Sequence, residues 1–73
     1  EKNVYVNLDK FDFEKIREKW KNIEGFSENR YFIRINTKGL ELKFFKGGKL
    51  FIKSEEFLEE KRVKTIIARY IGN

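Results

Sequence analysis

Cysteine, histidine, methionine and proline are all absent from this 73-residue chain. Without cysteine there are no disulfides, which is compatible with a reducing compartment, and we expect a cytoplasmic protein. Without histidine and cysteine, the usual zinc sites and nucleophile–base pairs are excluded. No apolar run approaches the ~20 residues of a membrane-spanning helix, and no signal peptide is visible. We therefore expect a non-catalytic protein with no metal, cofactor, small-molecule substrate or membrane partner.

Charge is abundant, since 40% of the residues are Asp, Glu, Lys or Arg. A chain rich in Lys and Glu that lacks the thermolabile residues cysteine and methionine favours a thermophilic source. The net charge is +5, and it is concentrated: residues 30–53 hold seven Lys or Arg and one Glu. A basic segment of this kind indicates an anionic partner such as nucleic acid. The length suits one small domain, residues 1–73.

Hydrophobic spacing predicts the elements. Strict alternation predicts a strand over 3–8, and helical spacing after the N-cap Asp12 predicts a helix over 12–24 that stops at Gly25. Three further strands are predicted in a meander, over 31–36, 40–45 and 49–53, with turns at 36–39 and 47–48. Ser54 is predicted to cap a last helix that ends at Gly72.

This order, β-α-β-β-β-α, predicts an α+β fold with one curved antiparallel sheet and two helices on one face. The helices should cover one set of alternating side chains: Val4, Val6, Leu8, Tyr31, Ile33, Ile35, Leu40, Leu42, Phe44, Leu50 and Ile52. The opposite face of the sheet is then left open.

Alternation assigns twelve side chains to that open face: Asn3, Tyr5, Asn7, Phe32, Arg34, Asn36, Glu41, Lys43, Phe45, Lys49, Phe51 and Lys53. Four are aromatic, four are cations and three are asparagines. Rings can stack on bases or wedge between them, cations neutralise phosphates, and amides read base edges and sugars. A one-residue slip in the second strand would expose Tyr31 in place of Phe32.

Two alternatives stay open. The face, or an outer strand edge, could instead bind a protein partner or a second copy of the chain. Aromatic residues also favour strands in general, and cross-strand rings stabilise a sheet without any ligand.

The chain resembles one half-repeat of the TATA-box-binding protein. "KNVYVNL" is similar to the opening strand of that repeat, "FDFEKIREKWKNIEGFSENRYF" to its first helix and exit, and "LKFFKGGKLFIKSEE" to its hairpin and the start of its last helix. The chain also resembles the N-terminal substrate-binding domain of bacterial type-three ribonuclease H, an accessory domain with this fold in one copy.

The resemblance implies DNA binding through the open, concave sheet face. It implies wedging roles for Phe45 and for Tyr31 or Phe32, base-edge contact by Asn3, and phosphate contact by Arg34. Apolar contacts fall on Tyr5 and Phe51, which are bulkier than the small or β-branched residues of the family. Lys53 departs in the same way. We therefore expect little sequence preference, with duplex DNA or an RNA/DNA hybrid as the partner.

Overall fold

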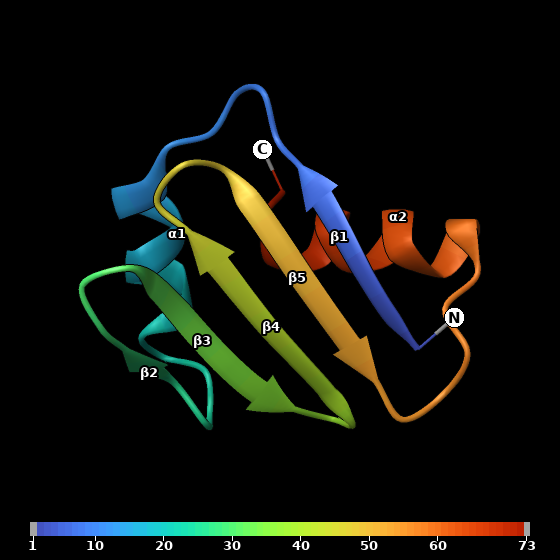
Figure 1. The fold of residues 1–73 in the computed structure, drawn as a ribbon. Coiled ribbons are helices and arrows are strands. Elements are labelled where there is room, and N and C mark those ends of the chain that lie inside the picture. The colour runs from blue at the N-terminus through green and yellow to red at the C-terminus, as the bar shows by residue number, and fades with distance from the viewer. Residues whose placement is uncertain (1, 73) are drawn as a thin grey trace.

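The computed structural model describes residues 2–72 and contains one antiparallel sheet with two helices behind it (Figure 1). The elements are β1 (Asn3–Asn7), α1 (Phe13–Trp20), β2 (Ser27–Glu28), β3 (Phe32–Thr37), β4 (Leu40–Phe45), β5 (Lys49–Ser54) and α2 (Glu60–Tyr70). The strand order is β1-β5-β4-β3-β2, and every neighbouring pair is antiparallel. The predicted α+β class and the single antiparallel sheet are confirmed.

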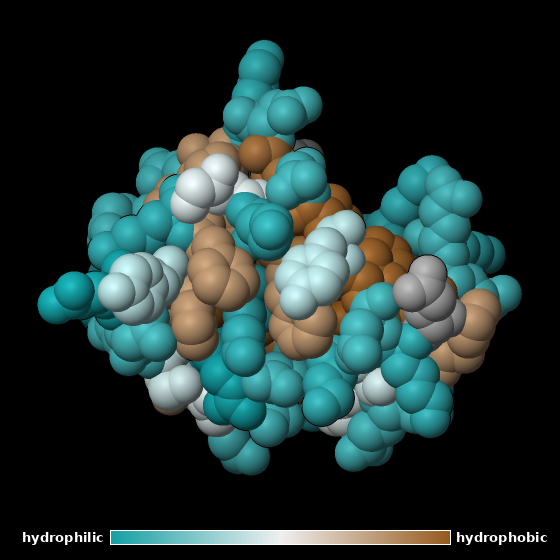
Figure 2. All heavy atoms as spheres, in the orientation of Figure 1, coloured by the Kyte–Doolittle hydropathy of each residue, from teal (hydrophilic) through white to brown (hydrophobic). Residues whose placement is uncertain are grey.

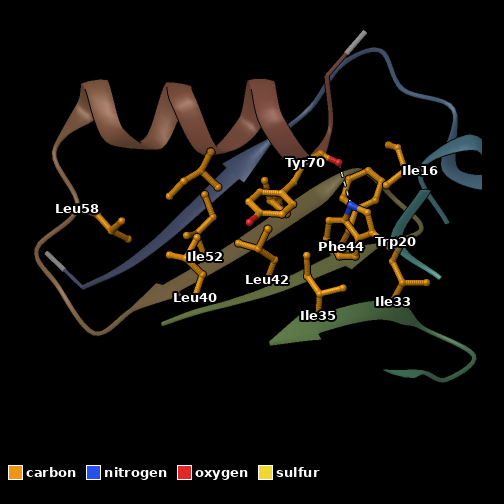
Figure 3. Close-up of a cluster of buried hydrophobic side chains, with 12 residues drawn as sticks. Ile16, Trp20, Ile33, Ile35, Leu40, Leu42, Phe44, Ile52, Leu58 and Tyr70 are labelled. Carbon is orange, nitrogen blue, oxygen red and sulfur yellow. Dashed lines mark hydrogen bonds between the residues drawn. The ribbon is translucent and has the colours of Figure 1, made fainter. Parts of the chain in front are cut away.

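The core lies between the helices and the sheet, and it contains the inward side chains of β3, β4 and β5 (Figure 3). Those inward side chains are the alternate apolar residues of each strand, as the period-2 pattern predicts. Helix α1 contributes Ile16 and Trp20, and α2 contributes Ile66 and Tyr70. The buried Trp20 Nε1–H donates a 2.8 Å hydrogen bond to the Tyr70 carbonyl oxygen, which joins the ends of the two helices.

Both predicted turns are present, and each places a glycine at positive φ. Gly39 has φ +77° in the turn that joins β3 to β4. In the next turn, Gly48 has φ +104°, and a Cβ there would lie 2.8 Å from the Leu8 carbonyl oxygen. A Cβ on Gly47 would meet nothing within 4 Å. Of the two adjacent glycines, Gly48 is therefore the one that the fold requires.

The first helix is shorter than predicted. Asp12 is the N-cap, as expected, and its side chain accepts a hydrogen bond from the backbone N–H three residues on. The helix ends at Trp20 instead of continuing to residue 24. Gly25 does not stop it: a Cβ on Gly25 would lie 2.4 Å from the backbone oxygen of Asn36, so this glycine permits a close approach to β3.

The last helix starts later than predicted, at Glu60. Ser54 does not cap it, because Ser54 is still part of β5, paired with Leu40. The Ser54 hydroxyl accepts a hydrogen bond from the Glu56 N–H at 3.0 Å, which closes a local turn and not a helix. The predicted end at Gly72 is confirmed, since the Gly72 N–H donates back to the Ile67 carbonyl oxygen.

Tyr31 was predicted in the core, and that prediction is wrong. The Asn29 side-chain oxygen accepts hydrogen bonds from the backbone N–H groups of Tyr31 and Phe32, at 2.8 and 3.0 Å, which forms a turn before β3. The Tyr31 side chain is 61% exposed as a result. No pattern in the sequence predicts β2, whose two residues pair with β3. Phe32 begins β3, so the one-residue slip does not occur.

Candidate nucleic-acid interface

The open face of the sheet brings together the side chains that alternation assigns to it. We call these twelve residues the platform. Strand register arranges them in three rows across β1, β5, β4 and β3. The rows are Asn3, Lys53, Glu41 and Asn36; then Tyr5, Phe51, Lys43 and Arg34; then Asn7, Lys49, Phe45 and Phe32. Ser27 of β2 lies opposite Arg34 and extends the middle row, a position that a two-residue strand gives no signal to predict.

The four platform rings form two pairs. Tyr5 and Phe51 have ring centroids 4.9 Å apart, and Phe32 and Phe45 have centroids 5.0 Å apart. Tyr5 is 65% exposed, whereas the three phenylalanines are half-buried. Two apolar clusters separated by polar atoms are visible on this face in Figure 2. In each pair, one ring packs against the other, and part of the ring surface remains exposed on the open face.

Lysine ammonium groups lie over these rings. The Lys43 Nζ is 5.4 Å from the Phe32 centroid and 5.8 Å from the Phe51 centroid, so it stands between the two pairs. The Lys49 Nζ is 5.5 Å from the Tyr5 centroid. These distances are within the range of cation–π attraction. The rings thus hold the two lysine ammonium groups close to the open face of the sheet.

Arg34 is already bonded within the platform. Its Nε lies 2.6 Å from a Glu41 carboxylate oxygen, and both side chains are partly buried. The hydrogen bond from Arg34 is the main cause that lowers the pKa of Glu41, and the charges of Arg34, Lys43 and Lys53 act in the same direction against the effect of burial. Glu41 is therefore ionised at neutral pH and neutralises Arg34.

Three platform lysines remain free of ion pairs within residues 2–72, namely Lys43, Lys49 and Lys53. Lys53 lies between Asn3 and Glu41 in the first row. These three lysines supply the net positive charge of the face.

Tyr31 is the one sequence-predicted site residue that lies off the platform. It sits in the turn before β3, where the Arg30 guanidinium carbon is 5.8 Å from its ring centroid. Asn3 and Asn7 are exposed at the two ends of β1, as the alternation predicts.

None of the three comparisons, with protein-family models, with curated proteins and with solved structures, finds a match to this chain. Neither helix within residues 2–72 is long and apolar enough to cross a membrane.

Proposed function

We propose that this chain is a non-catalytic nucleic-acid-binding module that uses the platform to bind duplex DNA or an RNA/DNA hybrid with little sequence preference. The observation that carries the proposal is the combination of two aromatic pairs with a lysine between them. Rings and cations on one open face match the bases and phosphates of nucleic acid. The resemblance to the TATA-box-binding protein half-repeat supports the same face and a duplex partner.

Each part of the platform has a distinct task in this proposal. Phe45, Phe51, Phe32 and Tyr5 stack on bases or wedge between them. Lys43, Lys49 and Lys53 contact phosphates, while the amides of Asn3 and Asn7 reach sugars or base edges. Because phosphate contacts and stacking carry little base information, low sequence preference follows.

Two carboxyl groups have shifted pKa values, and each is paired with an arginine. The pKa values of Glu28 and Glu41 are both lowered, each chiefly by a hydrogen bond from an arginine side chain. A general acid at neutral pH needs a raised pKa, so these two carboxylates are unsuited to that task. Within residues 2–72 there is also no group of three acidic side chains placed to hold a metal ion.

Fluorescence anisotropy with labelled 20-mers tests the proposal at low salt, using duplex DNA, a hybrid, single-stranded DNA and RNA. Wild-type protein should bind, and Phe45→Ala should weaken binding by about 5- to 100-fold, the loss of one stacked base. Phe57→Ala is the matched control, because Phe57 is 67% exposed and lies in the connection between β5 and α2, away from the platform.

The result separates this proposal from a protein-docking role for the same face. If no nucleic acid binds, and sedimentation shows a dimer that Phe45→Ala dissociates, the platform is a protein interface. If nucleic acid binds equally well to wild type and Phe45→Ala, Phe45 neither wedges nor stacks. Circular dichroism melting of each variant checks that the fold is retained.

A further inference from the structure

The two edges of the sheet differ in how they are protected. At one edge, β2 has only two residues, and its Glu28 forms an ion pair of 2.7 Å with Arg17 of α1. At the other edge, β1 pairs residue for residue with β5 over Asn3–Asn7, with no bulge. Natural edge strands are usually short, charged, kinked or covered, which prevents pairing with another chain. In a chain that is 40% charged, "NVYVN" has no charged residue and no proline.

The hydrogen bonds at the ends of β1 show which backbone groups face outward. The Leu8 N–H donates to the Gly48 carbonyl oxygen at 2.9 Å, and the Ser54 N–H donates to the Lys2 carbonyl oxygen at 2.8 Å. Even-numbered residues of β1 therefore hydrogen-bond to β5. In an antiparallel pair the residues between them turn their N–H and C=O groups away, here Asn3, Tyr5 and Asn7. Within residues 2–72, no further strand pairs with β1 at this edge of the sheet (Figure 1).

We infer that the outer edge of β1 pairs with β1 of a second copy of this chain, in antiparallel register about a two-fold axis at Tyr5. The sequence of β1 is the same in both directions, so this register matches it along its whole length. Asn3 of one copy faces Asn7 of the other, and Tyr5 faces Tyr5. All the outward backbone groups are then paired, with about six hydrogen bonds, two from each of three facing pairs.

The side chains of β1 are compatible with this pairing on both faces of the sheet. On the open face, Tyr5 is the most exposed ring of the platform at 65%, and it would pack against its symmetry mate. On the helix face, Val4 and Val6 are half-buried and would face Val6 and Val4 of the second copy. No like charges meet within the paired strands, so association has no electrostatic cost there.

Helix α2 lies behind the same part of the sheet (Figure 1). It crosses behind β5 and β1 and extends past the β1 edge in Figure 1. Its Val63 and Ile67 are only half-buried. In the two-fold arrangement both α2 helices lie on the same side of the joined sheet. A second copy offers the matching five-residue strand and pairs the outward backbone groups of Asn3, Tyr5 and Asn7, which is why it is the occupant that we infer.

The pairing shares Asn3, Tyr5 and Asn7 with the proposed nucleic-acid site, but the two proposals can be tested separately. It uses the edge of the sheet and leaves Phe45 and Lys43 uncovered. It also places the two platforms side by side on one continuous sheet. A failure to bind nucleic acid leaves the dimer intact, and a monomer that binds nucleic acid through Phe45 overturns only the dimer.

Analytical ultracentrifugation over micromolar to millimolar concentrations tests the inference with complementary variants. Wild-type protein should show a concentration-dependent shift from monomer to twice the monomer mass. In the double variant Asn3→Lys/Asn7→Lys, each lysine at position 3 would face the lysine at position 7 of the other copy, which gives two like-charge contacts. The dissociation constant of the dimer should therefore rise about tenfold or more. The same loss is expected for Asn3→Glu/Asn7→Glu, whereas an equimolar mixture of the two variants should dimerise again. The control Ser27→Lys/Asn36→Lys adds the same charge to the open face away from β1 and should dimerise like wild type.

A second measurement needs no variant. Hydrogen exchange of the outward N–H groups of Asn3, Tyr5 and Asn7 should slow as protein concentration rises, while exchange of the β2 amides should not change. Any of three results would overturn the inference. The wild-type protein could stay monomeric over the whole concentration range, or the lysine variant could dimerise like wild type. The third is an exchange rate of the outward amides that does not change with protein concentration.

Discussion

The salt dependence of nucleic-acid affinity should report how many platform cations contact phosphate. Three lysines of the platform are free of ion pairs within residues 2–72, and Arg34 is neutralised by Glu41. Each phosphate contact on duplex DNA contributes about −0.9 to the slope of log affinity against log salt concentration. Three contacts give a slope of about −2.7, which is a loss of roughly 40-fold between 50 and 200 mM salt. Counting Arg34 as a fourth free cation gives a steeper slope, about −3.6.

Substitution of single cations separates these two counts. Lys43→Gln should reduce the size of the slope by about 0.9, and Lys49→Gln and Lys53→Gln should do the same. The double variant Arg34→Gln/Glu41→Gln removes the ion pair without changing net charge, and its slope should equal that of wild type. Lys61→Gln on α2 is a charge-matched control, and it should leave the slope unchanged because Lys61 lies away from the platform.

Fluorescence anisotropy of a labelled duplex, titrated at four or more salt concentrations, gives each slope directly. If the three platform lysine variants keep the wild-type slope, these lysines do not contact phosphate. The platform is then not the surface that binds nucleic acid, as the proposed function requires. If the Arg34/Glu41 double variant loses about 0.9 of the slope, the ion pair opens in the complex and Arg34 contacts phosphate.

Two stability predictions follow from the same structure. Gly48→Ala should lower the free energy of unfolding in urea by about 1–3 kcal/mol, because residue 48 is held at positive φ against a backbone oxygen. Gly47→Ala should be neutral or stabilise the fold by up to about 1 kcal/mol. Equal effects of the two changes would contradict the conclusion that only Gly48 is required by the turn. The pKa of Glu41 is lowered in the folded state by its arginine partner, so its contribution to stability is present above its usual pKa and is lost as pH falls through the lowered value. Glu41→Gln should therefore flatten the fall of the urea midpoint as pH decreases below the usual pKa of a glutamate, and an unchanged fall would show that the ion pair does not stabilise the fold.

The sheet could be predicted from the sequence because its strands alternate strictly. In β3, β4 and β5 every second residue is apolar, and a strand places those residues on one face by geometry alone. The same rule assigned the platform residues, since the face opposite the core receives the remaining residues. The glycines at 39 and 48 fixed the turns, because few other residues adopt positive φ.

The helix boundaries could not be predicted in the same way, because tertiary contacts compete with local signals there. Ser54 followed by two glutamates is a typical helix start, yet the Ser54 backbone pairs with β4 and its N–H donates to the Lys2 carbonyl oxygen. Sheet pairing therefore extends β5 through the residue that would begin the helix. Leu58, buried in the core, then fixes the path of the connection before α2 begins at Glu60.

The ion pair between Arg34 and Glu41 marks the limit of the sequence argument for function. Alternation placed both residues on one face but said nothing of their contact, because they lie diagonally across β3 and β4 and not opposite each other. From the sequence alone, Arg34 is a cation that could contact phosphate. In the structure its guanidinium forms an ion pair with the Glu41 carboxylate. The cations without a partner on this face therefore decide the charge that it presents to a ligand. Lys43 is one of them, and its Nζ lies over one ring of each aromatic pair. In the proposed binding mode it is the cation that would contact phosphate. The same reasoning makes Lys43→Gln the single change that should most weaken binding, since it removes a charge and the link between the two ring pairs together.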